Sequence, residues 1–285
     1  MKQLLCVAVV AVLSSTTTVQ AEILRGLTLG NQLISFDSAT PMNTTAVSIS
    51  GLIAGDSLVS IDQRPSNGLL YGFATNGSFG RLYTIDNGGA ASLRSTLSVA
   101  TTGNFFDIDF NPTVDRLRVV SNAGQNLRVN VDNGLAIVDG MLQFAAGGPN
   151  AADTPAVLAA AYTNNVGNAT TTSLFGLDGA TQSLVLQSPP NDGTLTRVGS
   201  LSGILFAGGA AFDISGTSGV GYAVLNGFEL SQVDLSTGAT TSLGFIGANS
   251  NVIGLAAPSA VPEPSSMGIL LLGAAACAGY RRRRA

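Results

Sequence analysis

The fold of this chain is indicated most clearly by two neighbouring stretches, Phe106-Asp107-Ile108-Asp109-Phe110-Asn111-Pro112 and Arg116-Leu117-Arg118-Val119-Val120-Ser121. Apolar and polar side chains alternate through most of them, as in a β-strand, and the Asn-Pro at the end of the first is turn chemistry. The two stretches therefore predict two antiparallel strands joined by a short turn. The arrangement recurs at residues 59–73 and 211–224, and each copy has a large side chain nine residues after its last strand Asp: Tyr71, Arg118 and Tyr222.

A second pattern, a strand-like alternation that ends in Asp, also repeats along the chain. Its five copies are spaced by 49, 46, 46 and 56 residues and end at Asp37, Asp86, Asp132, Asp178 and Asp234. Gly or Asn follows within a few residues, so each Asp is expected to hold a tight turn by accepting backbone hydrogen bonds. Repeats of about 45–50 residues with four strands each are typical of β-propeller blades.

Counting the units predicts an all-β propeller with five blades of four strands. Four whole units run from about residue 57 to 247, and residues 158–162 begin the degenerate fourth unit. An N-terminal remnant at residues 23–51 supplies three strands of the last blade, and residues 251–256 supply the missing one. Pairing of the two chain ends would leave no long free edge. A six-bladed propeller, a two-sheet sandwich and a β-solenoid are the alternatives. The expected outer strands are 91–97, 135–144, 184–187 and 240–245.

The ends of the chain have the pattern of export signals. A basic start, an apolar run to Leu13 and the small-residue site Val19-Gln20-Ala21 predict a secretory signal peptide over residues 1–21. Residues 22–257 would form the propeller domain. The remaining segment, residues 258–285, contains Pro262, Glu263 and Pro264, an apolar run from Met267 to Gly279, and the basic cluster Arg281, Arg282, Arg283 and Arg284.

This C-terminal arrangement resembles the PEP-CTERM sorting signal of Gram-negative bacteria. The resemblance implies export, transient retention in the inner membrane, and processing near the Pro-Glu-Pro triplet by an exosortase-type peptidase. As a helix, residues 265–280 would span roughly 24 Å, somewhat less than the ~30 Å bilayer core. The four arginines would keep their end on the cytoplasmic side. The alternative is an ordinary C-terminal membrane anchor.

The composition excludes many kinds of chemistry. The chain has no His, and its single lysine (Lys2) and both cysteines (Cys6 and Cys277) lie in the expected signal segments. Disulfides within the domain, Ser-His-Asp or Cys-His catalysis, Schiff-base chemistry and the usual zinc sites are therefore excluded. Residues 22–264 keep all 17 acidic but only 8 of the 13 basic residues, so the net charge changes from −4 to −9. Such a charge argues against binding to nucleic acid or anionic lipid.

Aspartates on the expected inner strands are the candidate site residues: Asp62, Asp107, Asp109 and Asp213. Inner strands line the channel of a propeller, so Asp62, Asp109 and Asp213 could converge at one mouth of the ring. Several hard oxygen ligands around an axis would suit Ca²⁺. The recurrence of this Asp in several blades favours the other interpretation, in which each Asp hydrogen-bonds backbone amides at its own strand-to-turn junction.

An enzymatic function would require catalytic groups that these aspartates do not clearly indicate. Glycoside hydrolysis requires a general acid and a second carboxylate at a defined separation, and no such pair is evident. Glu229, the one glutamate well inside the domain, lies on an expected outer position of its blade. No catalytic residue is assigned. Exposed aromatic rings could stack on sugars, but with 6% aromatic residues most are expected in the core. The candidates are Phe105, Phe106, Tyr71, Tyr162 and Tyr222.

Residues 62–72, 107–121 and 126–130 resemble the domain-of-unknown-function family 4394, and the resemblance covers about residues 23–256. It implies a secreted bacterial β-propeller without an assigned activity, and proteins with the PEP-CTERM signal are associated with the extracellular polymeric matrix. We therefore predict an exported surface or matrix protein with a non-enzymatic binding or structural role, associated with exopolysaccharide. The alternative function is a carbohydrate-active enzyme that uses channel-mouth aspartates.

Overall fold

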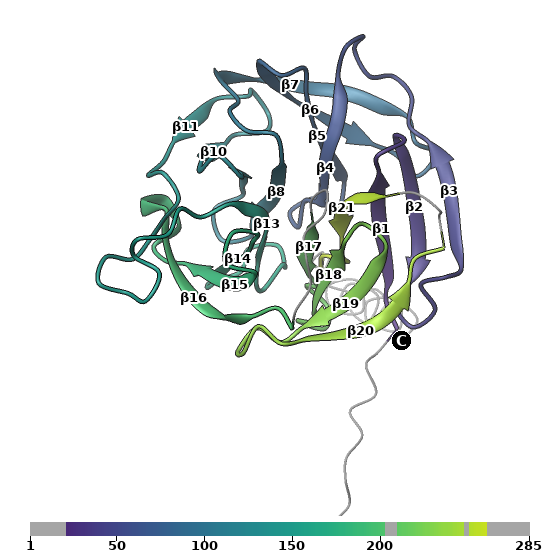
Figure 1. Ribbon diagram of the computed structural model, residues 1–285. Helices are drawn as coiled ribbons and strands as arrows, with labels where there is room; N and C mark the ends of the chain where they lie inside the picture. The colour runs from purple at the N-terminus through teal and green to yellow at the C-terminus, as the bar shows by residue number, and fades with distance from the viewer. Residues whose placement is uncertain (1–20, 203–209, 248–250, 261–285) are drawn as a thin grey trace, which may run out of the picture.

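The computed structural model describes residues 21–202, 210–247 and 251–260, which form five sheets around one axis (Figure 1). We number these blades along the chain and give their strands from the axis outward. Blade 1 contains β21 (Val252–Ala256), β1 (Ile23–Thr28), β2 (Gln32–Asp37) and β3 (Thr44–Ser48). Blade 2 contains β4 (Ser57–Gln63), β5 (Leu70–Thr75), β6 (Phe79–Ile85) and β7 (Ala91–Ala100).

The other three blades follow the same plan, with one extra strand. Blade 3 contains β8 (Phe106–Asn111), β9 (Arg116–Ser121), β10 (Asn126–Val129) and β11 (Ala136–Val138). Blade 4 contains β13 (Val157–Tyr162), β14 (Leu174–Asp178), β15 (Ser183–Gln187), the 3₁₀ helix η1 (Pro190–Asp192), β16 (Thr194–Ser200) and the added strand β12 (Gln143–Phe144). Blade 5 contains β17 (Ala211–Ile214), β18 (Gly221–Leu225), β19 (Glu229–Val233) and β20 (Thr240–Phe245).

The prediction of a five-bladed propeller closed by its two ends is confirmed. The last strand, β21, is the inner strand of blade 1 and pairs antiparallel with β1, so that Arg25 lies opposite Ala256. Figure 1 shows yellow-green β21 beside purple β1, although more than 220 residues separate them in the chain. All five sheets and the strands that close the ring lie within residues 22–260.

The core lies between the blades. The described residues form five buried apolar clusters, and each cluster fills the gap between two neighbouring blades. Between blades 2 and 3, for example, Phe73 packs edge-on against Phe106 with ring centroids 5.8 Å apart. Inner strands are covered on both faces, which explains why all six residues of β13 are buried. Outer strands such as β7 are covered on one face and expose most of their residues.

Blades 3 and 4 correct the predicted strand assignment. Leu174–Asp178 is the second strand of blade 4, not the third, and the blade closes with β16 instead of residues 184–187. The predicted closing strand 135–144 of blade 3 is split into β11 and β12, and β12 pairs in parallel with β16. The split occurs at Asp139, whose carboxylate binds Arg118 and Arg128 and so turns the chain away from blade 3.

The turn aspartates behave as predicted in four of five cases. Asp37, Asp86 and Asp234 each accept a backbone N–H from the residue two positions on, and Asp178 accepts one from Thr181. The prediction is wrong for Asp132. In blade 3 Asn130 occupies the turn position, bonded to Leu135 and Gly134, and Asp132 forms a surface ion pair with Arg94 instead.

Both predicted signal segments fall outside the described residues, apart from their edges. The sorting motif Pro262, Glu263 and Pro264 and the arginines at 281–284 are among the residues that the structure does not describe. In the part of the chain that it does describe, no helix has the length and apolar character needed to cross a membrane.

Candidate functional site

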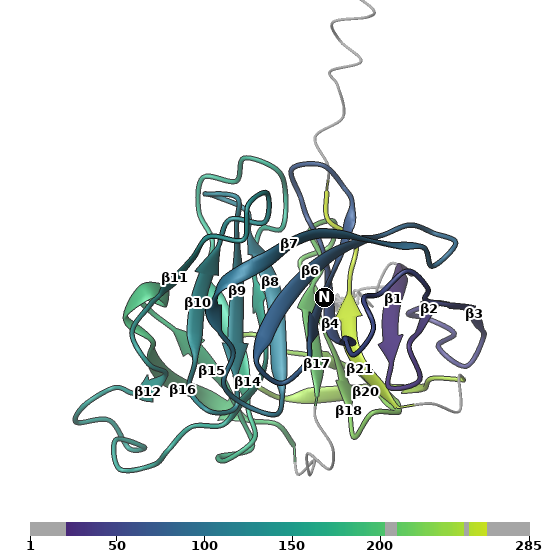
Figure 2. The same cartoon turned by 90° about the horizontal axis from the view of Figure 1, so that it is seen from above.

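Three of the predicted channel carboxylates meet at the axis. Asp62 on β4, Asp109 on β8 and Asp213 on β17 each place one oxygen so that the three atoms lie within 4.8 Å of one another. Each residue is only 1% exposed. Their strands are inner strands of three blades and lie in the middle of the molecule (Figure 2). The carboxylates therefore form a buried group inside the channel and do not stand at an open mouth.

Each of these carboxylates accepts a hydrogen bond from the next blade around the ring. The three bonds run from Phe110 N–H to Asp62 (2.7 Å), from Tyr162 N–H to Asp109 (3.2 Å) and from Ala257 N–H to Asp213 (2.6 Å). The predicted junction within each Asp's own turn is thus only part of their role. Because donor and acceptor lie 44 to 53 residues apart, these bonds tie neighbouring blades together.

The other two inner strands carry alanine at the equivalent position, Ala161 and Ala256, the residues that precede the bonded N–H groups of Tyr162 and Ala257. An Asp at these sites would bind an N–H of the following blade. Those N–H groups are instead bound locally: Gln63 N–H by Asp62 and Ile214 N–H by Asp213, both at 2.6 Å. All five inner strands thus have this N–H satisfied. One carboxylate oxygen, Asp109 Oδ2, is buried without a hydrogen-bond partner.

Asp107 lies one layer along the channel and makes a similar bridge. Its side chain accepts the Ala160 N–H of blade 4 at 2.9 Å and the hydroxyl of Ser60 in blade 2. Ser60 occupies the position equivalent to Asp107 and accepts the Ile108 N–H of blade 3. Asp107, at 3% exposed, therefore joins blades 2, 3 and 4.

Burial controls the protonation of these groups. It raises the pKa of Asp107 to about 8 and that of Asp213 to about 7. Burial also raises the pKa of Asp62 and Asp109 well above the usual range, and the nearby charges of Asp213 and Asp62, respectively, raise it further. Near neutral pH the group therefore holds at least one proton, because three adjacent buried negative charges would be unfavourable.

The geometry does not fit the Ca²⁺ hypothesis well. Calcium takes six to eight oxygen ligands. Five of the six oxygens of Asp62, Asp109 and Asp213 already accept one backbone N–H group each, so each of the five keeps only one free lone pair. The single uncommitted oxygen, Asp109 Oδ2, suits a shared proton better than a cation.

This protonation predicts an unusual dependence of stability on pH. Between the pKa of an unfolded Asp (about 4) and the folded values of about 7 and 8, the folded protein binds more protons than the unfolded one. The free energy of unfolding should therefore fall as the pH rises from 5 to 8.5. A shift of about three pKa units corresponds to roughly 4 kcal/mol. Urea denaturation at several pH values measures the slope.

The chain offers a clean background for that measurement. Residues 22–260 contain no histidine and no cysteine, so their N-terminal amine is the only group of ordinary pKa that titrates in this range. Asp213→Asn should flatten the slope, whereas Asp153→Asn, a change at an exposed loop position, should not. A stability that rises with pH would contradict the protonated channel and indicate ionised carboxylates holding a cation.

One end of the channel, where the inner strands end, is crossed by residues 257–260, which we call the C-terminal strap. Ser259 N–H donates to the Gln63 side chain of blade 2, and the Pro258 carbonyl accepts the Gly216 N–H of blade 5. Ala260 pairs with Val166 of blade 4. The approach is close, because a Cβ on Gly216 would lie 2.7 Å from the backbone nitrogen of Ala260. The strap explains why the carboxylates are inaccessible from this side.

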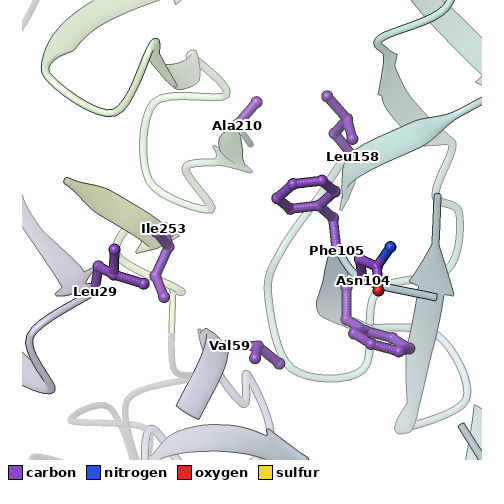
Figure 3. A pocket seen from close by; sticks show the side chains of 8 residues that line it. Leu29, Val59, Asn104, Phe105, Leu158, Ala210 and Ile253 are labelled. Carbon is purple, nitrogen blue, oxygen red and sulfur yellow. The ribbon is translucent and has the colours of Figure 1, made fainter. Parts of the chain in front are cut away.

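The other end, where the inner strands begin, contains a pocket of about 130 Å³ (Figure 3). Each inner strand, or the residue just before it, contributes one apolar side chain from the same repeat position: Ile253, Val59, Phe106, Leu158 and Ala210. Leu29, Asn104 and Phe105 complete the lining. Leu29 is 68% and Phe105 is 39% exposed. We call this space the mouth pocket.

The predicted aromatic candidates divide between core and pocket. Tyr71, Tyr162 and Tyr222 are at most 2% exposed, and Phe106 is 6% exposed. Phe105 is the one candidate whose ring could meet a ligand from solvent. The mouth pocket was not predicted, although the sequence contains a signal for it. Each of the five lining residues from the inner strands is apolar, and each stands three positions before the aspartate or alanine that occupies the position of Asp62 in its blade.

Together, the fold and the self-bonded channel define a five-bladed β-propeller. Residues 32–256 match the family described as domain of unknown function DUF4394, and the chain belongs to that family. Residues 260–284 match the PEP-CTERM protein-sorting motif, which implies an exported protein sorted to the cell surface and processed by an exosortase. Both resemblances noted in the sequence are confirmed.

Solved structures resemble the chain in fold only. A structural genomics protein of unknown function from Bacteroides thetaiotaomicron is 14% identical with a TM-score of 0.51, over 82% of this chain and 64% of that one. An auxiliary nutrient binding protein from Bacteroides ovatus is 13% identical with a TM-score of 0.41, over 70% and 55%. The chain thus spans less than two thirds of these proteins. No curated protein matches the chain.

Proposed function

We propose that this protein is a non-enzymatic binding or structural component of the cell surface or extracellular matrix of a Gram-negative bacterium, associated with exopolysaccharide. The observation that carries the proposal is the state of the channel carboxylates. Asp62, Asp107, Asp109 and Asp213 are at most 3% exposed and bonded between blades. A substrate could reach these carboxylates only if neighbouring blades of the propeller separated. This argues against the alternative function as a carbohydrate-active enzyme.

The proposed division of the chain into three segments supports the proposed export of the protein to the cell surface. In the proposal residues 1–21 direct secretion, residues 22–257 form the propeller, and residues 258–285 act as the sorting signal. The strap holds the chain to the end of the channel that it crosses, up to Ala260. The seven residues from there to Met267 can span at most about 25 Å. While the tail is held in the inner membrane, the end with the strap therefore faces the membrane and the mouth pocket faces away from it.

Charge selects among possible polymers. Without its signal segments, residues 22–257 have 16 acidic and 8 basic side chains and a net charge of −8, which disfavours association with anionic polysaccharides. The mouth pocket adds exposed apolar and amide groups, Leu29, Phe105 and Asn104, and no titratable side chain among the described residues. The polymer that fits the proposal is therefore an uncharged exopolysaccharide.

Affinity electrophoresis of residues 22–260 in gels containing purified neutral or anionic exopolysaccharide tests the proposal. We expect retardation in the neutral polymer and no release of reducing ends. Retardation in neither polymer would remove the exopolysaccharide association. Release of reducing ends that Asp109→Asn abolishes without lowering the melting temperature, and that Asp153→Asn leaves intact, would establish the enzymatic alternative.

A further inference from the structure

The mouth pocket has the size of a single ring. Its volume is about 130 Å³. Apolar protein cavities of about 150 Å³ hold benzene, whereas pockets for drug-sized ligands are several times larger. The side chains of Leu29, Val59, Leu158 and Ile253 surround one space together with Phe105 (Figure 3). A six-membered ring would fill this space, and a disaccharide would not enter it.

The chemistry of the lining selects the kind of ring. Of the eight described residues that line it, seven are apolar, and Asn104 supplies the one polar side chain among them. A bare sugar would bury several hydroxyl groups without partners, and a carboxylate or ammonium group would lose its hydration without a counter-charge. An uncharged apolar ring has neither hydroxyl groups nor charges that would be buried without partners. Asn104 could hydrogen-bond one hydroxyl or ether substituent on such a ring.

The backbone is shaped to build this lining. Three inner strands have a β-bulge at the residue that lines the pocket, where the strand register skips Val59, Leu158 and Ile253. A bulge re-aims a side chain that strict alternation would turn away from the axis. The same distortion in three different blades places apolar groups at one spot, and it leaves Leu29 and Phe105 partly exposed to water beside them.

We propose that the mouth pocket is a binding site for one uncharged, mainly apolar six-membered ring, aromatic or alicyclic, with at most one hydrogen-bonding substituent. The site goes beyond the proposed association with exopolysaccharide, because it recognises the ring and not the sugar. The ring can be a free small molecule or a substituent on a glycan. Phe105 would stack on it, and Asn104 would bind its substituent.

NMR titration of residues 22–260 tests the site with four probes: phenol, cyclohexanol, phenyl β-glucoside and methyl β-glucoside. We expect saturable binding of the first two at about millimolar Kd, as their size permits. Phenyl glucoside should bind if the ring may be carried by a sugar, whereas methyl glucoside should not bind. Phe105→Ala should weaken phenol binding at least fivefold, and Ala210→Phe, which fills the pocket, should abolish it.

Phe245→Ala is the matched control, since Phe245 is 62% exposed on the outer strand β20 and should leave phenol binding unchanged. Melting temperatures verify that each variant is folded, and Phe105→Ala decides the matter if Ala210→Phe does not fold. The proposal is overturned if no ring gives saturable shifts, if methyl glucoside competes as well as phenol, or if the Phe105 and Phe245 variants behave alike. Polysaccharide retardation that survives Ala210→Phe would leave the proposed function standing without the pocket.

Discussion

A chain shortened to residues 22–250 should not form a stable propeller, because it loses the inner strand of blade 1. In β21 and the residue after it, Val252, Leu255, Ala256 and Ala257 are at most 3% exposed. Their removal uncovers Leu24 and Leu27 of β1, both fully buried in the intact chain. Each large apolar side chain contributes about 1.5–3 kcal/mol when buried, and the backbone pairing of β21 with β1 is lost as well. The sum approaches the whole stability of about 5–15 kcal/mol expected for a domain.

Circular dichroism and urea denaturation of residues 22–250 and 22–260 would measure this effect. We expect a cooperative transition for the longer chain and none for the shorter one. A third chain, residues 22–257, keeps β21 but lacks most of the strap, and it should unfold cooperatively at a lower urea concentration than 22–260. The explanation is wrong if 22–250 and 22–260 share one midpoint, since closure by β21 would then contribute nothing.

Replacing Arg118 by Met should destabilise the protein by up to about 3–5 kcal/mol, the cost of removing one partner of a buried ion pair. Arg118 is 2% exposed and donates hydrogen bonds to Asp139, Asn126, Asn191 and Tyr162. The last two belong to blade 4, so one guanidinium group joins two blades. Without it, Asp139 retains only Arg128, and the buried side chains of Asn126 and Tyr162 each lose a hydrogen bond.

Urea denaturation at pH 7 would measure the loss, with two variants as references. Arg116→Met changes the exposed arginine two residues earlier on the same strand and should shift the free energy of unfolding by less than about 0.5 kcal/mol. Arg118→Lys keeps the charge but not the planar set of donors, so its stability should fall between the other two. Equal stability of the Arg118→Met and Arg116→Met variants would show that the network does not hold the blades together.

The sequence alone was sufficient for most of the architecture, because that information is local. Alternation within a strand and Asp, Asn or Gly at the turns depend on neighbouring residues, and their period indicated blades and their number. The prediction of strand order within a blade failed where the local sequence pattern was ambiguous. The segment Leu174–Asp178 has the pattern of a third strand, yet it pairs between β13 and β15 as the second. Asn130 performs a turn role that the pattern assigned to Asp132.

From the sequence alone one could predict the number of blades, closure by the two ends, the sorting signal at the C-terminus, and the chemistry excluded by the lack of His, Lys and Cys in residues 22–264. Only the tertiary structure decided what the channel does. Asp62, Asp109 and Asp213 bind N–H groups 44 to 53 residues away, and burial, not their neighbours in sequence, raises their pKa values. The mouth pocket likewise depends on bulges at Val59, Leu158 and Ile253. Strict alternation turns these side chains away from the axis, and only the pairing of complete blades turns them back.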